Sequence, residues 1–207
     1  MKISKIETQK KNKDRLNIYI DDTFAFGIST DVYLKYSLKK NQEIDNEFIE
    51  EILLAEENSK AINSAVKYLS YRQRSIKEMT DHLNRKGYDG IIIEKTLDYL
   101  LDKNYLNDYE FAESFIKDKS YLNKYGINKI RYELLNKGVS KEIIAKTLTF
   151  DNDEEFDNAM ELAIKKMKSY KNQDRDSIYR KLGGFLQRKG YRYDTVKKVL
   201  KEVLNDI

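Results

Sequence analysis

Histidine and cysteine, two side chains that often perform covalent chemistry in enzymes, are almost absent from this 207-residue chain. The single histidine, His82, lies between Asp81 and Leu83 in a helical pattern, which is more typical of a solvated or partly packed side chain than of a catalytic base. No Ser/His/Asp set can be assembled around it. The absence of cysteine excludes thiolate catalysis, disulfides and Cys-based zinc sites. Because the chain also has neither a P-loop nor a dinucleotide fingerprint, we predict that it is not an enzyme and uses no cofactor.

Two short patterns could in principle hold an ion or a phosphate. The acidic run at residues 151–155 offers carboxylates for calcium, but it lacks the glycine and terminal glutamate of an EF-hand loop. A solvated linker that also caps the following helix explains this run better. The pair Gly183-Gly184 is expected to interrupt a basic helix, and it lacks the flanking strand that a phosphate-binding glycine loop follows. We therefore predict no metal site.

Lysine and arginine are the strongest candidates for a functional role, because they recur on the equivalent helix of three successive segments. In a chain with 36% charged residues such a helix face can simply be solvated. If the positions are in register, they instead form a basic stripe that suits phosphates or an acidic partner surface. The interleaved tyrosines, Tyr125 among them, are expected mostly to pack rather than to stack on bases. The candidate partner- and DNA-binding residues are Arg72, Arg74, Lys77, Arg85, Lys86, Arg131, Lys137, Lys181, Arg188 and Lys189.

The helices that carry these cations form an internal repeat. Three segments share the pattern Leu-x-x-Lys-Gly, and their glycines, Gly87, Gly138 and Gly190, are 51 and 52 residues apart. Counted from each glycine, positions −11, −8, −4, +6 and +10 are apolar or aromatic in all three copies. Spacings of three and four place these residues on one helix face. Each copy therefore predicts a basic helix, a glycine that ends it in the left-handed conformation, and a second helix.

A further apolar helix is expected before each pair, at residues 61–71, 108–120 and 155–167. One unit of about 50 residues cannot bury its apolar face alone, but stacked units can. The predicted fold class is therefore mainly α, with three tandem three-helix repeats forming an elongated solenoid. The expected repeats span residues 58–107, 108–153 and 154–207.

Residues 1–57 differ from the rest of the chain and predict a small β-containing module. Alternating β-branched and apolar residues lie at 3–8 and 16–20, and Asp21-Asp22 reads as a turn before residues 23–27. These features favour a hairpin or a three-stranded sheet. A short helix near residues 31–36 and a first long helix capped by Asp45 are expected to follow.

Net charge is only +4, but its distribution is uneven. Residues 1–58 hold 9 Lys/Arg against 12 Asp/Glu, whereas residues 59–207 hold 30 against 23, so the positive excess lies in the repeats. No apolar stretch approaches the roughly 20 residues that span a bilayer, and the first residues lack the apolar core of a secretory signal. We expect a cytoplasmic protein without a membrane partner, and a monomer.

The ordered motifs of the three repeats resemble the RecX family of recombinase regulators. Tyr-Leu-Ser-Tyr-Arg-Gln-Arg-Ser-Ile-Lys-Glu-Met at residues 68–79 is similar to the opening signature of that family. The resemblance is strong over residues 60–207 and looser in the front segment. Proline, which the family often has, is replaced here by Gln73 and Ile127. The other segments that carry the resemblance are residues 83–88, 104–112, 126–134, 137–140 and 181–191.

This resemblance implies a non-enzymatic modulator of RecA. Members of the family lie along the groove of the RecA–DNA filament and restrain its growth, strand exchange and co-protease function. The implied partners are the RecA filament and, through the basic stripe, weakly bound single- or double-stranded DNA. From the residues alone, a DNA- or RNA-binding repeat protein that acts without RecA remains an alternative. An enzyme has no positive support in the sequence.

Overall fold

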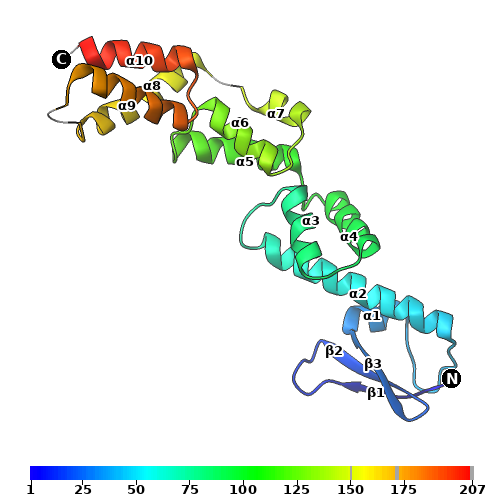
Figure 1. Cartoon of the computed structure of the whole chain (residues 1–207). Coiled ribbons are helices and arrows are strands. Elements are labelled where there is room, and N and C mark those ends of the chain that lie inside the picture. The colour runs from blue at the N-terminus through cyan, green and yellow to red at the C-terminus, as the bar shows by residue number, and fades with distance from the viewer. Residues whose placement is uncertain (150, 171–172, 206–207) are drawn as a thin grey trace. The chain divides into compact units, whose positions relative to one another are not determined.

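The computed structural model describes residues 1–149, 151–170 and 173–205, which form three strands and ten helices (Figure 1). The chain divides into two compact units. The first holds residues 1–72 and 79–105, and the second holds residues 73–78 and 106–207. The predicted fold class, mainly α with a small N-terminal sheet and three helical repeats, is confirmed in these elements.

The N-terminal module is a three-stranded antiparallel sheet of β1 (Ile3–Thr8), β2 (Arg15–Ile20) and β3 (Thr23–Ser29), in that order. Asp21 and Asp22, between β2 and β3, have φ values of 46° and 63°. Two consecutive left-handed residues match the twist of a tight hairpin, and aspartate tolerates this conformation better than most residues do. The predicted turn therefore joins the two strands as expected.

One face of the sheet forms the core of this module, together with α1 (Thr30–Lys35) and the first half of α2. Ile18 and Ile28 are fully buried there, and they belong to the same core cluster as Val32 of α1 and Ile52 of α2. The first helices therefore cover the apolar face of the sheet.

Helix α2 (Asn46–Leu69) is one continuous helix of 24 residues. Its start is as predicted, because the Asp45 side chain accepts a hydrogen bond of 2.8 Å from the Phe48 amide. The sequence predicted a separate helix from residue 61, but no glycine or proline interrupts the segment before it, so the helix continues. The predicted domain boundary after residue 57 therefore falls inside α2, and the domain division remains a prediction.

The remaining helices supply the three repeats. The first repeat contains α3 (Ile76–Arg85) and α4 (Gly90–Asp102) after the end of α2, and the first residues of α3 belong to the second compact unit. The second repeat contains α5 (Asp108–Tyr121), α6 (Ile127–Asn136) and α7 (Lys141–Thr147). The third contains α8 (Asn152–Met167), α9 (Arg175–Arg188) and α10 (Tyr193–Asn205).

The three Lys-Gly motifs end their helices in the same way. Gly87, Gly138 and Gly190 have φ values of 83°, 82° and 93°. In each copy the amide after the glycine donates to the carbonyl of the motif leucine, at 3.3, 3.1 and 3.3 Å. This is the Schellman arrangement, in which a left-handed residue satisfies the last carbonyls of a helix. The predicted glycine ends are confirmed.

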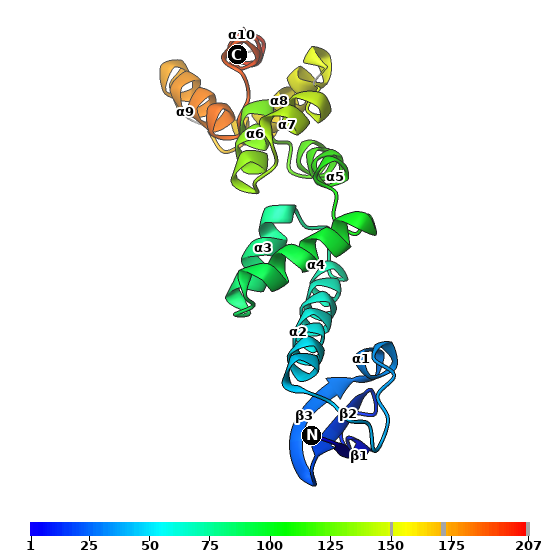
Figure 2. The same cartoon turned by 90° about the vertical axis from the view of Figure 1, so that its right-hand side faces the viewer.

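Gly183 and Gly184 do not interrupt α9, contrary to the sequence prediction. Gly183 is buried, and a Cβ atom at that position would lie 3.3 Å from Leu200 of α10, so the glycine allows two helices to approach closely. Helices α8, α9 and α10 pack against one another, and they lie together in both views of the chain (Figure 2).

The acidic run at residues 151–155 caps α8 as predicted, but it is not a solvated linker, because residues 152–155 lie within the helix and Glu155 is fully buried. The Asp151 side chain accepts a hydrogen bond of 2.9 Å from the Asp153 amide. Among the described residues, no group of three or more histidines, cysteines or carboxylates lies in a position to hold a metal ion. None of the described helices is long and apolar enough to cross a membrane.

Candidate nucleic-acid and partner interface

Two of the predicted basic residues, Lys77 and Lys137, lie where α3 meets the end of α6. The ammonium group of Lys137 is 2.6 Å from the Glu78 carboxylate, and both side chains are mostly buried. Lys77 donates a hydrogen bond of 3.1 Å to the carbonyl oxygen of Asn136. Both cations bind other groups of the same chain. Their first role is therefore to hold the end of α6 against the start of α3.

Four other predicted residues lie before α3 and at its end. Arg72 is exposed and Arg74 is half-buried in the segment between α2 and α3. Arg85 and Lys86, at the end of α3, are exposed, and Arg85 Nε donates to the Asp81 carbonyl at 3.1 Å. Basic side chains at this helix end also complement the negative end of the helix dipole.

Three lysines from different segments surround Tyr125 in the second unit. Lys129 Nζ lies 4.0 Å from the centre of the tyrosine ring, Lys189 Nζ 5.1 Å and Lys119 Nζ 5.6 Å. The backbone fixes this arrangement, because the amide of Tyr125 donates to the Lys119 carbonyl and the amide of Gly126 donates to the Lys189 carbonyl. We call Lys119, Lys129, Lys189 and Tyr125 the Tyr125 cluster.

The Tyr125 cluster carries uncompensated positive charge. In the part of the chain that the structure describes, Lys119, Lys129 and Lys189 form no ion pair with a carboxylate. A tyrosine ring face attracts each ammonium group by about 0.5–1 kcal/mol, which offsets only part of the repulsion between three like charges. A multivalent anion such as a nucleic-acid backbone would relieve that repulsion, since ammonium groups bind phosphates strongly.

A second cationic cluster lines a hollow of about 530 Å³ beside α9. We call Arg180, Lys181 and Arg188 the α9 cluster; Tyr170 and Ser177 complete the lining, which contains no carboxylate among the described residues. Gly184 makes room for this cluster, because a Cβ atom there would lie 3.2 Å from Nη1 of Arg188. The guanidinium group therefore folds back along α9. This cluster also suits a phosphate.

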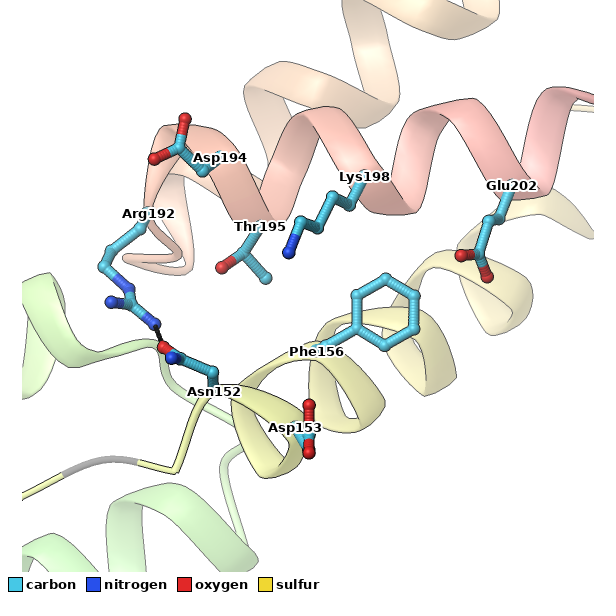
Figure 3. A pocket seen from close by; sticks show the side chains of 8 residues that line it. All are labelled: Asn152, Asp153, Phe156, Arg192, Asp194, Thr195, Lys198 and Glu202. Atoms are coloured by element: carbon cyan, nitrogen blue, oxygen red, sulfur yellow. Dashed lines mark hydrogen bonds between the residues drawn. The ribbon is translucent and has the colours of Figure 1, made fainter.

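A hollow of about 450 Å³ between α8 and α10 has a different character (Figure 3). Its arginine, Arg192, is hydrogen-bonded to Asn152 and pairs at 2.6 Å with the fully buried carboxylate of Glu155. Three other carboxylates, of Asp153, Asp194 and Glu202, also line it. Because its charges are mixed and its arginine is engaged, this hollow does not suit a phosphate backbone.

His82 is packed rather than free, in agreement with one of the two predicted placements. Its ring stacks on Tyr68 with ring centres 4.0 Å apart, and its Nε2 atom lies 3.2 Å from the Ser64 hydroxyl oxygen. These contacts join α3 to α2 within the first unit. The histidine therefore has a structural environment.

The structure brings only some of the ten predicted residues together. Lys181 and Arg188 share the α9 cluster, Lys189 belongs to the Tyr125 cluster, and Arg131 is exposed on α6. Lys119 and Lys129 are not among these ten residues, although Lys129 belongs to the predicted basic helix of the second repeat. The two lysines converge with Lys189 only through the packing of the repeats. Their spacing along the chain carries no such signal.

Comparison with known proteins gives a consistent result. The model for the regulatory protein RecX N-terminal domain matches residues 1–45, and models for the first, second and third RecX three-helix domains match residues 61–100, 107–148 and 153–200. The chain is 39% identical over 207 residues to regulatory protein RecX of Clostridium botulinum (strain Alaska E43 / Type E3), covering 99% of this chain and 97% of the relative. The corresponding protein of Clostridioides difficile (strain 630) is 39% identical over 204 residues, covering 98% and 96%. A solved crystal structure of regulatory protein RecX superimposes with a TM-score of 0.79 at 30% identity, covering 96% of this chain and 98% of that one.

Proposed function

Because the chain belongs to the RecX family of regulatory proteins, we propose that it binds the RecA–DNA filament and restrains its ATPase, strand-exchange and co-protease activities. Its relatives are named regulatory proteins, which favours regulation over catalysis. In this proposal the protein acts in the cytoplasm, as a monomer and without a cofactor.

The observation that carries this proposal beyond family membership is the uncompensated positive charge of the second unit. The Tyr125 cluster and the α9 cluster together present six cations, and no described carboxylate forms an ion pair with any of them. A regulator that lies against a nucleoprotein filament meets phosphates, acidic protein side chains or both. The two clusters supply the charge that such a surface requires.

Within the proposal, the predicted residues divide into two roles. Lys77 and Lys137 support the fold at the junction of the first two repeats, since both are engaged there. The remaining predicted residues contact the filament, and Lys119, Lys129 and Arg180 join them. The contacting residues predicted from sequence are Arg72, Arg74, Arg85, Lys86, Arg131, Lys181, Arg188 and Lys189.

RecA-catalysed ATP hydrolysis on single-stranded DNA, titrated with this protein at fixed salt, tests the proposal. A fall in the rate at substoichiometric protein is expected if filament growth is blocked, and a fall near saturation is expected if the groove is coated. An unchanged rate at equimolar protein would contradict the proposal.

A second function, nucleic-acid binding without RecA, is favoured by the same uncompensated lysines. Its signature would be tight binding to naked DNA that weakens steeply as salt rises. The net charge of +4 argues against strong autonomous binding, because such proteins usually carry a larger excess. Fluorescence anisotropy with labelled single-stranded DNA, at two salt concentrations and without RecA, separates the two functions.

A further inference from the structure

The start of one basic helix docks onto the end of the next one in two places in the second unit. Ser75 precedes α3, and its hydroxyl donates a hydrogen bond of 2.6 Å to the Lys137 carbonyl at the end of α6. Gly126 precedes α6, and its amide donates at 2.9 Å to the Lys189 carbonyl at the end of α9. Ser75 and Gly126 are both twelve residues before the glycine of their own motif. The contact is therefore a repeating feature.

The motif glycine makes this close approach possible. A Cβ atom on Gly138 would lie 2.5 Å from Cβ of Lys77, and one on Gly190 would lie 2.3 Å from Cβ of Lys129. The positive end of one helix dipole also faces the negative end of the next, which stabilises the contact. The Lys-Gly end of a basic helix is thus a docking site for the N-terminal end of another helix.

In the first repeat, the end of α3 has the same conformation, but no helix start docks onto it. Gly87 has the same left-handed φ of 83°, and Tyr88 closes the same 3.3 Å hydrogen bond to Leu83. Among the described residues, nothing lies within 4 Å of a Cβ atom built on Gly87, and no donor is hydrogen-bonded to the carbonyl of Lys86. Both residues are exposed. The three helix ends share one backbone conformation, but only the ends of α6 and α9 contact the start of another helix.

We infer that the end of α3, at Lys86 and Gly87, is a docking site for the N-terminal end of a helix in a partner protein. The expected helix begins with a small capping residue, as the helices after Ser75 and Gly126 do, and it presents free amide or hydroxyl donors to the Lys86 carbonyl. This inference rests on the proposed function, because it assigns the docking site to the filament protein rather than to DNA.

In a second copy of this chain, none of the three basic helices offers an equivalent free start. The starts of α3 and α6 are already docked within their own chain. In the third repeat the equivalent position is Ile178, which is buried and lies inside α9, because that helix begins one turn earlier at its cap, Asp174. The extra turn therefore moves the start of α9 away from the position at which α3 and α6 dock. The occupant is therefore a different protein.

The test compares Gly87→Asn with Gly90→Asn in the full chain. Asparagine tolerates a left-handed φ, so Gly87→Asn fills the docking site while the helix end keeps its conformation. Gly90 is the matched control, since it is exposed, three residues away, and also has nothing within 4 Å of its Cβ position. We expect Gly87→Asn to raise the Kd for RecA filaments on single-stranded DNA at least tenfold. Gly90→Asn should stay within twofold of the unmodified chain.

A second measurement leaves the backbone unchanged. Because the chain has no cysteine, Lys86→Cys can be labelled at a single site with an environment-sensitive fluorophore. Filament addition should shift its emission to shorter wavelength, whereas the label at Lys40→Cys, an exposed lysine of the N-terminal module, should not respond.

The outcomes separate this inference from the proposed function. Normal filament binding by Gly87→Asn, with no emission shift at position 86, would overturn the docking site and leave the filament function intact. Failure of the unmodified chain to bind filaments would overturn both. Self-association that disappears in Gly87→Asn, seen by sedimentation, would give the site to a second copy and overturn the partner assigned here.

Discussion

Lys129 lies closest to the ring in the Tyr125 cluster, and it has no carboxylate partner among the described residues. If the cluster binds phosphates, Lys129→Gln should weaken binding to the filament and lower the salt dependence of binding by about one charge. Titrations at several salt concentrations measure both quantities. The matched control is Lys201→Gln, which neutralises an exposed lysine of α10 and should change neither one appreciably. Equal effects of the two substitutions would mean that only net charge matters.

Tyr191 is a residue whose role is structural and testable by pH. Its side chain is buried, and its hydroxyl donates a hydrogen bond of 2.8 Å to the Lys124 carbonyl. Burial, with a further contribution from the carboxylate of Glu155, raises the pKa of Tyr191 above its ordinary value. The folded state therefore keeps this proton at pH values where the unfolded chain loses it.

It follows that Tyr191 contributes stability that is fully present below the unfolded pKa of about 10, and that this contribution is lost progressively as the pH rises from there through the raised pKa of the folded state. Tyr191→Phe should lower the free energy of unfolding by about 1 kcal/mol at pH 7, because the Lys124 carbonyl loses its donor. The gap between the two proteins should narrow above pH 10, since phenylalanine has no proton to lose. Urea unfolding of both proteins at pH 7 and at pH 10.5 measures this difference in the free energy of unfolding.

Tyr193→Phe, at an exposed tyrosine two residues further along, is the matched control for that experiment and should resemble the unmodified chain at both pH values. A gap between Tyr191→Phe and the unmodified chain that is the same at both pH values would contradict the assigned role of burial.

At this scale the sequence located the basic helices but not the partners of individual cations. Lys77 and Lys137 look like the other candidates in the sequence, yet the structure engages both at a junction. Lys119 and Lys129 were not selected, because their convergence with Lys189 depends on how two repeats pack. Pairing of charges is a tertiary property, so periodicity within one helix cannot reveal it.

Helix ends were predicted well, because a glycine after a basic residue has few structural alternatives. The motif Leu-x-x-Lys-Gly ended all three basic helices with the expected left-handed residue. Glycines inside a helix were predicted less well. Gly183 was expected to break α9, but it lies against Leu200 of a neighbouring helix, and that packing contact is invisible in a local pattern. Likewise, α2 continues past residue 57 because no glycine or proline interrupts it, although the change in sequence character there suggested a boundary.

Replacing different motif glycines should lower the free energy of unfolding by different amounts, although their local sequences agree. Gly190→Ala places a methyl group 2.3 Å from Cβ of Lys129 at a left-handed φ, so strain and overpacking add to about 3 kcal/mol. Gly87→Ala meets no neighbour and should cost only about 1 kcal/mol for the backbone conformation. Urea unfolding compares the two variants. Equal costs would show that conformation alone requires these glycines, and that helix docking contributes nothing.

For the whole molecule, net charge and charge position make separable contributions to filament binding. The chain carries only +4, so a double charge reversal brings it to neutrality wherever it is made. Arg85→Glu with Lys86→Glu removes charge at the open end of α3. Lys39→Glu with Lys40→Glu makes the same change in net charge at exposed lysines of the N-terminal module. Both double variants therefore have the same net charge and differ only in where the charge was changed.

If the filament contacts the end of α3, the Arg85/Lys86 variant should bind at least tenfold more weakly than the Lys39/Lys40 variant at the same salt concentration. Both should keep most of their stability, since these are surface changes, although two glutamates at a helix C-terminus cost about 1–2 kcal/mol. Filament affinity measured at 50 and 200 mM salt, alongside thermal unfolding, checks this. Higher salt should weaken binding by both variants and narrow the difference between them, because a variant that has lost ionic contacts depends less on salt. Equal binding by the two variants would place the filament contact elsewhere and leave the Tyr125 and α9 clusters as the surface to test.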